Sequence, residues 1–313
     1  MKSYIAGPTL LMVVLLLLVG ALAAAPVEAN GSGLAVKEGN GLSEEPAANN
    51  AVATALGFQT IYVSTSGAGR MGTLRYAAAD ILAYDVATEV WSLYFDGSDV
   101  GLTRNVNNFA IREFGTILMT VDRPQNVPDV GVVQPHDILL FTPMTLGNDT
   151  TGTWQLYFDG SDMELTTPGE RLDALAIRES QLMVSIRGNG QVDATGQELA
   201  ARDDDVLVAF LWDLGGNTAG YWQRLRDVTV LPDMVAENIT GLYNAPNDPA
   251  NNDFYVSFAN QFNVGGVKGQ AGTIVHMVHN APLGTYTAQP FWDARQAGLV
   301  GVMDGFDLRG QVE

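Results

Sequence analysis

Apolar residues in this chain gather in short segments separated by turn-forming residues. The segments run seven to nine residues, are rich in Val, Ile, Leu, Phe, Tyr and Trp, and alternate with clusters of Gly, Asn, Asp and Pro. No segment after residue 50 sustains a helical period, and short apolar runs of this kind are typical of β-strands. One stretch predicts four strands, over residues 153–160, 172–179, 181–188 and 205–213. We therefore expect an all-β chain.

The strand pattern recurs four times along the chain. The segment WSLYFDGSDV from Trp91 returns as WQLYFDGSDM from Trp154, with weaker echoes from Trp222 and Ala288. The copies place one aspartate at an equivalent position at spacings of 63, 68 and 66 residues: Asp96, Asp159, Asp227 and Asp293. Such a period indicates units that bury a face only against their neighbours. Four strands in each of four repeats predict a four-bladed β-propeller with antiparallel blades.

The two ends of the repeat array predict how the ring closes. Residues 60–67 match the second strand of the unit, whereas residues 302–308 match the first strand. We expect the C-terminal strand to join the N-terminal blade, which protects the edges of the sheets. Residues 51–58 are the other candidate for that strand. A β-sandwich array fits less well, because a sandwich needs about seven strands per domain.

The N-terminal region predicts export. Residues 1–29 combine Lys2, an apolar run over residues 10–25 and a small-x-small site at residues 27–29, which is the pattern of a signal peptide. An uncleaved membrane anchor is the alternative, and only then do we expect contact with a membrane. Residues 30–50 predict a flexible linker, and residues 51–313 the propeller domain. We expect a secreted, extracellular or cell-envelope protein.

Composition excludes several classes of function. A formal net charge of −19 disfavours nucleic acid and anionic membrane surfaces as partners. The chain has no cysteine, so it has neither disulfides nor thiol catalysis. Of three histidines, His276 and His279 lie on opposite faces of a predicted strand and cannot chelate a metal together. Serine-hydrolase and zinc-protease motifs are absent from the sequence.

One end of the predicted propeller concentrates the long connections. Those between the second and third strands of each blade cover residues 65–79, 123–136, 187–204 and 259–272. Long connections on one face of a repeat protein favour that face for binding. Aspartates recur there at the ends of outermost strands (Asp96, Asp159, Asp227, Asp293) and before third strands (Asp80, Asp137, Asp205). We interpret these as structural, because aspartates at turns accept hydrogen bonds from nearby backbone amides.

A third polar set lies where the innermost strands begin, beside the axis: Asn107, Asp173, Thr240 and Asp304. Two carboxylates, an amide and a hydroxyl that converge on a narrow channel could share a cation, and Ca²⁺ accepts such oxygen ligands. A solvated polar mouth is the simpler alternative. Asp173 and Asp304 are also the carboxylates that could divide acid and base roles in a hydrolase or lyase.

The tryptophans fall into two groups. Trp91, Trp154 and Trp222 recur near the start of the outermost strand, which predicts packing between blades; a platform for stacking on glycans is the alternative. Trp212 and Trp292 do not fit that register. We expect those two to be more exposed and to be candidates for contact with a ligand.

The string WSLYFDGSDVGL from Trp91, with the inner and third strands that accompany it, resembles a repeat found in bacterial extracellular β-propeller-like proteins without established activity. The resemblance implies export and a propeller-like fold, and it brings no catalytic residues. The fourth copy departs from the pattern, with RDVT at residues 226–229 in place of FDGS. We expect a non-catalytic module that binds an extracellular protein or polysaccharide through its long-loop face; the carboxylate-dependent enzyme is the alternative.

Overall fold

The computed structural model describes residues 46–178, 181–226, 237–244, 253–280 and 285–310. The signal-like segment and residues 30–45 of the predicted linker therefore lie outside the described residues. Within the described ranges, no helix is long and apolar enough to cross a membrane.

Four antiparallel sheets of four strands each form the blades. From the axis outwards, blade 1 contains β24 (Met303–Gly310), β1 (Phe58–Thr65), β4 (Ile81–Asp85) and β5 (Val90–Phe95). Blade 2 contains β6 (Val106–Ile111), β7 (Ile117–Val121), β10 (Ile138–Thr145) and β11 (Thr151–Phe158). Blade 3 contains β12 (Leu172–Arg178), β13 (Gln181–Ile186), β16 (Val206–Asp213) and β17 (Ala219–Arg226). Blade 4 contains β18 (Ile239–Asn244), β19 (Phe254–Phe258), β22 (Thr273–Asn280) and β23 (Thr285–Asp293).

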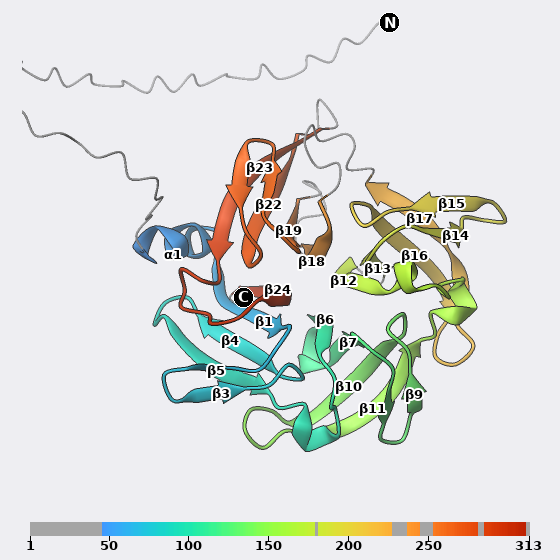
Figure 1. Cartoon of the computed structure of the whole chain (residues 1–313), viewed down its shortest axis with the longest axis horizontal. Coiled ribbons are helices and arrows are strands. Elements are labelled where there is room, and N and C mark those ends of the chain that lie inside the picture. Colours follow the sequence, from blue (N-terminus) through green and yellow to red (C-terminus); the bar gives the residue numbers. More distant parts are fainter. Residues whose placement is uncertain (1–45, 179–180, 227–236, 245–252, 281–284, 311–313) are drawn as a thin grey trace, which may run out of the picture. The chain divides into compact units, whose positions relative to one another are not determined.

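The blades form a closed ring. The inner strands contact one another in a cycle, β24 to β6, β6 to β12, β12 to β18 and β18 to β24, around the centre seen in Figure 1. Strand β24 pairs with β1, with Asp307 opposite Tyr62, so the C-terminal strand completes the N-terminal blade. The predicted four-bladed β-propeller and its mode of closure are confirmed, and the β-sandwich alternative is wrong.

A helix precedes the first strand, which the sequence pattern did not predict. Helix α1 spans Pro46–Ala55. Proline suits the first turn of a helix, alanine favours helix formation, and Gly57 follows with a φ of 81°. Asn49 and Asn50 are buried, so residues 46–50 belong to the folded domain and not to a flexible linker. Residues 51–58 are thus largely helix rather than an inner strand.

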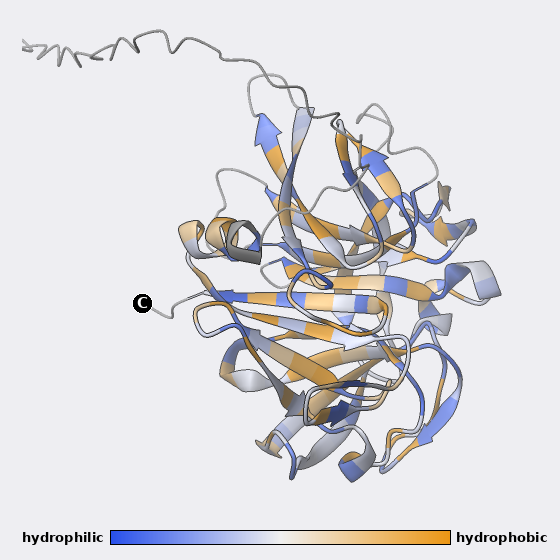
Figure 2. Cartoon of the chain, turned by 60° about the vertical axis from the view of Figure 1, so that its left-hand side comes forward, coloured by the Kyte–Doolittle hydropathy of each residue, from blue (hydrophilic) through white to orange (hydrophobic). Residues whose placement is uncertain are grey.

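The core lies in the four interfaces between adjacent blades, which we call seams. One buried cluster fills each seam, with Phe109 in seam 1/2, Phe158 in seam 2/3, Phe254 in seam 3/4 and Phe306 in seam 4/1. Hydrophobic residues run along the strands and hydrophilic ones are frequent at turns (Figure 2). Each blade therefore depends on two neighbours for the burial of its two faces.

Each connection that the sequence presents as a long loop contains a short β-hairpin. The four hairpins are β2–β3 (Gly69–Met71, Leu74–Tyr76), β8–β9 (Gln125–Val127, Gly131–Val133), β14–β15 (Gly190–Asp193, Glu198–Ala201) and β20–β21 (Phe262–Val264, Val267–Gly269). One side of each hairpin extends a seam core through buried residues such as Val127, Val192 and Val264. Strands β3, β9 and β15 lie towards the outside of the ring in Figure 1. The hairpins thus cover the ends of the seams.

Candidate functional site

The repeated aspartates after the outermost strands organise turns. Asp96 Oδ1 accepts the backbone N–H of Ser98 at 3.0 Å and its hydroxyl at 2.6 Å. Asp159 Oδ1 accepts the same two bonds from Ser161 at the same distances. Asp293 Oδ1 instead accepts backbone N–H bonds from two following residues at 2.9 and 3.1 Å. Asp227 lies outside the described residues.

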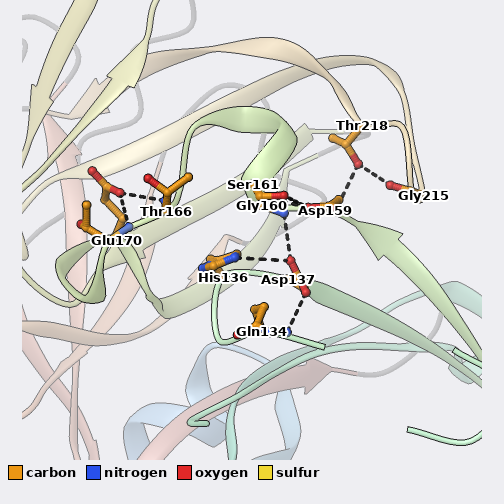
Figure 3. Close-up of polar contacts among 11 residues, drawn as sticks. Gln134, His136, Asp137, Asp159, Gly160, Ser161, Thr166, Glu170, Gly215 and Thr218 are labelled. Carbon is orange, nitrogen blue, oxygen red and sulfur yellow. Dashed lines mark hydrogen bonds and ion pairs between the residues drawn. The ribbon is translucent and has the colours of Figure 1, made fainter. Parts of the chain in front are cut away.

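The same turns also hold neighbouring blades together, through an arrangement that we call the latch. In seam 1/2, the backbone N–H of Asp96 donates to Thr150 Oγ1 at 3.0 Å, and the N–H of Thr150 donates to Asp99 Oδ2 at 2.9 Å. In seam 2/3, the N–H of Asp159 donates to Thr218 Oγ1 at 2.9 Å (Figure 3). The N–H of Thr218 donates to Asp162 Oδ2, also at 2.9 Å. The latch therefore explains the FDGSD motif, because residues of this motif join neighbouring blades and so help to build the ring.

A tryptophan accompanies each latch. Trp154 Nε1 donates to the carbonyl of Val100 at 3.0 Å, and Trp222 Nε1 donates to that of Met163 at 3.0 Å. Trp91 Nε1 makes the corresponding bond across seam 4/1, to Ala297 at 2.7 Å. These contacts between blades are what the recurring tryptophans predict.

Seam 4/1 uses helix α1 in place of a latch threonine. Asn49 Oδ1 accepts the backbone N–H of Asp293 at 2.7 Å, and Asn49 Nδ2 donates to the carbonyl of the same residue at 3.0 Å. Asn50 Nδ2 donates to Tyr84 on β4 at 2.9 Å. The segment before the first strand therefore helps to close the ring.

The aspartates before the third strands are also structural. Asp80 accepts backbone N–H bonds from Ala77 at 2.7 Å and Gly97 at 3.1 Å, and Asp137 accepts the equivalent pair from Gln134 and Gly160 (Figure 3). Asp205 accepts the N–H of Arg202 at 3.0 Å and pairs with Arg224 at 3.2 Å. These side chains connect the end of a hairpin to the outer strand of its own blade.

The polar residues beside the axis form a different arrangement, which we call the axial mouth: Asn105, Asn107, Asp173, Asn238 and Asp304. Asp173 Oδ1 accepts from Asn107 Nδ2 at 3.3 Å, and Asp173 Oδ2 accepts from Asn238 Nδ2 at 3.0 Å. Asp304 Oδ2 accepts from Asn105 Nδ2 at 2.5 Å. Thr240 does not join them through its side chain, since its Oγ1 lies 3.4 Å from Ser257 Oγ.

Two of these residues could have been found from the sequence. Asn105 and Asn238 each lie two positions before a member of the predicted axial set, Asn107 and Thr240. Residues two apart on extended backbone point to the same side. This spacing is the sequence signal that could have placed Asn105 and Asn238 beside the axis.

Burial raises the pKa of both mouth carboxylates. The pKa of Asp304 is raised to about 7, mainly by burial, with the charge of Asp173 adding to the effect and the Asn105 hydrogen bond opposing it. Burial likewise raises the pKa of Asp173, against its hydrogen bonds from Asn107 and Asn238. Charging either group inside the mouth is therefore costly unless a cation compensates it.

The mouth has oxygen atoms suited to a hard cation. The buried Oδ1 atoms of Asn105 and Asn238 have no hydrogen-bond partner in the described part of the protein. With the carboxylates of Asp173 and Asp304, they form the donor chemistry that Ca²⁺ accepts. Among the described residues, no group of three or more His, Cys, Asp or Glu side chains is placed to hold a metal, so amide oxygens would have to contribute.

A buried asparagine beside the mouth joins three blades. Asn108 Nδ2 donates to the carbonyl of Asp173 at 3.0 Å and to that of Thr240, while Asn108 Oδ1 accepts the N–H of Leu175 at 3.1 Å. A Cβ at Gly305 would lie 2.9 Å from the Asn108 amide carbon, which accounts for glycine there. Asn108 was not predicted, because its partners come from other blades.

The two tryptophans outside the latch register differ in solvent exposure. Trp212 is 71% exposed, as expected. Trp292 is only 2% exposed and packs against Tyr84, with ring centroids 5.5 Å apart, so its expected availability to a ligand is wrong. Its strand ends in seam 4/1, where the core of blade 1 covers it. His276 is buried, 3.1 Å from Asp253, in keeping with a structural role.

Stability is expected to fall as pH rises between about pH 4 and about pH 7. The pKa of Asp304 rises from 3.8 to about 7 on folding, so the stabilisation from its neutral form is complete below 3.8 and lost as pH passes about 7. Asp307, whose pKa is raised to about 6 by burial, acts in the same direction. Asp304→Asn should raise the melting temperature near pH 8 by about 5 °C, or about 2 kcal/mol, with little change near pH 4.

Thermal melts of the wild type, Asp304→Asn and Asp129→Asn across this range check the prediction. Asp129 is an exposed aspartate of the β8–β9 turn and serves as the matched control. A wild type that melts higher at alkaline pH, or an Asp304→Asn profile parallel to the wild type, would contradict the assignment.

No known protein-family model matches the chain, and no curated protein matches it.

Proposed function

We propose that this protein is an exported, non-catalytic binding module that holds an extracellular protein or polysaccharide on the face containing the axial mouth. The observation that carries the proposal is the contrast between two kinds of aspartate. Those in the turns and latches accept backbone hydrogen bonds that build the ring. Within the described ranges, Asp173 and Asp304 accept hydrogen bonds from side-chain amides only, and burial makes their charged forms unfavourable.

The fold does not require carboxylates at these two positions. Blades 2 and 4 have Asn107 and Thr240 at the equivalent place. Blades 2 and 4 therefore form without an acid at this position. Two buried acids at one end of the axis are more consistent with a ligand site than with a role in building the blades. Export rests on the signal-peptide pattern of residues 1–29 and on the resemblance to bacterial extracellular repeats.

We extend the proposal to calcium at the mouth. A bound cation would balance the negative charge of the two carboxylates and would be coordinated by the unpartnered amide oxygens of Asn105 and Asn238. It could also present open coordination positions to hydroxyl or carboxylate groups of the ligand.

A carboxylate-dependent hydrolase or lyase is the second candidate. The observation that favours it is the pKa of Asp304, near 7, beside the second carboxylate of Asp173, since a general acid needs a pKa near the working pH. Against it, both carboxyl groups are largely buried and each already accepts asparagine amides.

Binding to a panel of immobilised polysaccharides and to cell-envelope extracts tests the proposal. For ligands whose binding depends on calcium, we expect the Asp173→Asn, Asp304→Asn double variant to lose binding about tenfold or more, and Asp129→Asn to bind as the wild type. EDTA should weaken binding and lower the melting temperature of the wild type alone. Unchanged calcium-dependent binding by a folded double variant would exclude the mouth.

New reducing ends or unsaturated sugars released from the same polysaccharides would identify the enzyme instead. That activity should then disappear in Asp173→Asn, while binding without turnover supports the module.

A further inference from the structure

Blade 3 carries three aromatic side chains together on one face of its outer strands. Phe210 and Trp212 lie two apart on β16, and Tyr221 on β17 is paired with Phe210. The rings of Phe210 and Tyr221 are stacked, with centroids 5.0 Å apart and planes 6° apart. The Trp212 ring lies 6.2 Å from Tyr221 at 39°. We call this set the aromatic platform.

The platform lies at the opposite end of the blade from the axial mouth. Strand β12 begins at the mouth with Asp173, and alternating antiparallel pairing makes β16 begin at the mouth end and finish at the far end. Trp212 is the penultimate residue of β16. The platform also lies on the two outer strands of the blade, whereas Asp173 lies on the innermost one, so a ligand on the platform is separate from one at the mouth.

Blade construction does not require these aromatics. In blade 2, the pair equivalent to Phe210 and Tyr221 is Thr142 and Thr153, since the flanking pairs Phe141–Trp154 and Ala209–Trp222 correspond. Trp212 corresponds to Met144, and both lie in the register shift that follows. The same sheet thus forms with two threonines and a methionine. Phe210 also packs against the core of seam 3/4. The exposed Trp212 and its neighbour Tyr221 break the repeat, which a purely structural role would preserve.

We propose that the aromatic platform is a second binding site, for a neutral polysaccharide. The apolar C–H face of a pyranose ring can stack on the exposed indole of Trp212 and on neighbouring Tyr221. Exposed polar side chains flank the rings: Asp213 follows Trp212, and Gln223 lies two residues after Tyr221 on the same side of β17. These groups can exchange hydrogen bonds with sugar hydroxyls.

The size of the platform favours a sugar over a protein. A stable protein interface buries about 800 Å² on each partner, whereas an aromatic side chain provides about 200 Å². Phe210 and Tyr221 are already half-buried, so only Trp212 offers most of its surface. A few sugar residues can cover such an area. The net charge of −19 disfavours acidic polysaccharides and so selects a neutral one.

Affinity electrophoresis in native gels that contain a neutral β-glucan, a galactomannan or a starch polymer tests the site, with a sulfated polysaccharide as the charged comparison. We expect at least one neutral polymer to retard the wild type. Trp212→Ala should weaken that retardation about tenfold, and Trp212→Phe should restore part of it. Met144→Ala is the matched control, because Met144 is 81% exposed at the same position in blade 2.

The platform is independent of the mouth, so the Asp173→Asn, Asp304→Asn double variant should bind the neutral polymer as the wild type does. Retardation by none of the neutral polymers overturns the inference. Retardation that Trp212→Ala leaves unchanged, or retardation by the sulfated polymer alone, also overturns it. Loss of binding in the mouth variants but not in Trp212→Ala would place the polysaccharide at the mouth and overturn the platform.

Discussion

Removal of residues 302–313 is expected to abolish the cooperative thermal transition. Strand β24 provides the inner strand of blade 1, and Met303, Phe306 and Leu308 are almost completely buried. Burial of each such side chain contributes about 2 kcal/mol, and a whole domain is stable by only about 5–15 kcal/mol. The deletion also removes Asp307, whose carboxylate accepts the N–H of Ile111 in blade 2 at 2.9 Å.

Circular dichroism melts and gel filtration check this expectation. A chain that ends at Gly310 keeps all of β24 and is the control, with a transition close to that of the full chain. A soluble protein that lacks residues 302–313 and still melts cooperatively near the wild-type temperature would show that three strands suffice in blade 1.

Trp222→Ala is expected to lower the free energy of unfolding by about 4 kcal/mol. The side chain is fully buried in seam 2/3, packs edge to face on Phe158 with centroids 5.9 Å apart, and donates to the carbonyl of Met163. Alanine leaves a cavity and leaves that buried carbonyl without its donor, and each of these effects is destabilising.

Trp212→Ala provides the comparison within the same blade. Its indole is largely in solvent, so the free energy of unfolding should change by less than about 0.5 kcal/mol. Urea titration of both variants measures the difference. Equal destabilisation by the two substitutions would mean that the seams do not depend on the latch tryptophans.

Local pattern was sufficient for most strands but not for the first helix or the hairpins. Strands such as β12 and β16 are short, apolar and bounded by turn residues, so the pattern alone marks them. Helix α1 is a single alanine-rich segment among polar residues, and its buried Asn49 and Asn50 look like linker residues until their partners in blades 4 and 1 are known. The hairpins have strands of only three or four residues, too short for a period of two to stand out.

The candidate site was only partly predictable, because its hydrogen bonds cross between blades. Asp173 and Asp304 follow from the repeat register, since both open an inner strand. Their partners Asn238 and Asn105 lie 65 and 199 residues away in sequence. The side chain of Thr240 shares the register of the set yet faces Ser257, because a position in a repeat does not decide where a side chain finds its partner.

The sequence by itself determined the number of blades, the order of their strands and the position of each FDGSD turn, because these follow from local hydrophobic pattern and from a repeat that can be counted. The tertiary structure alone decided what each turn contacts. The latch threonines Thr150 and Thr218 lie 54 and 59 residues from the aspartates that they bind. It also decided that Trp212 is exposed and Trp292 buried, because burial of a residue depends on the blade that packs against it.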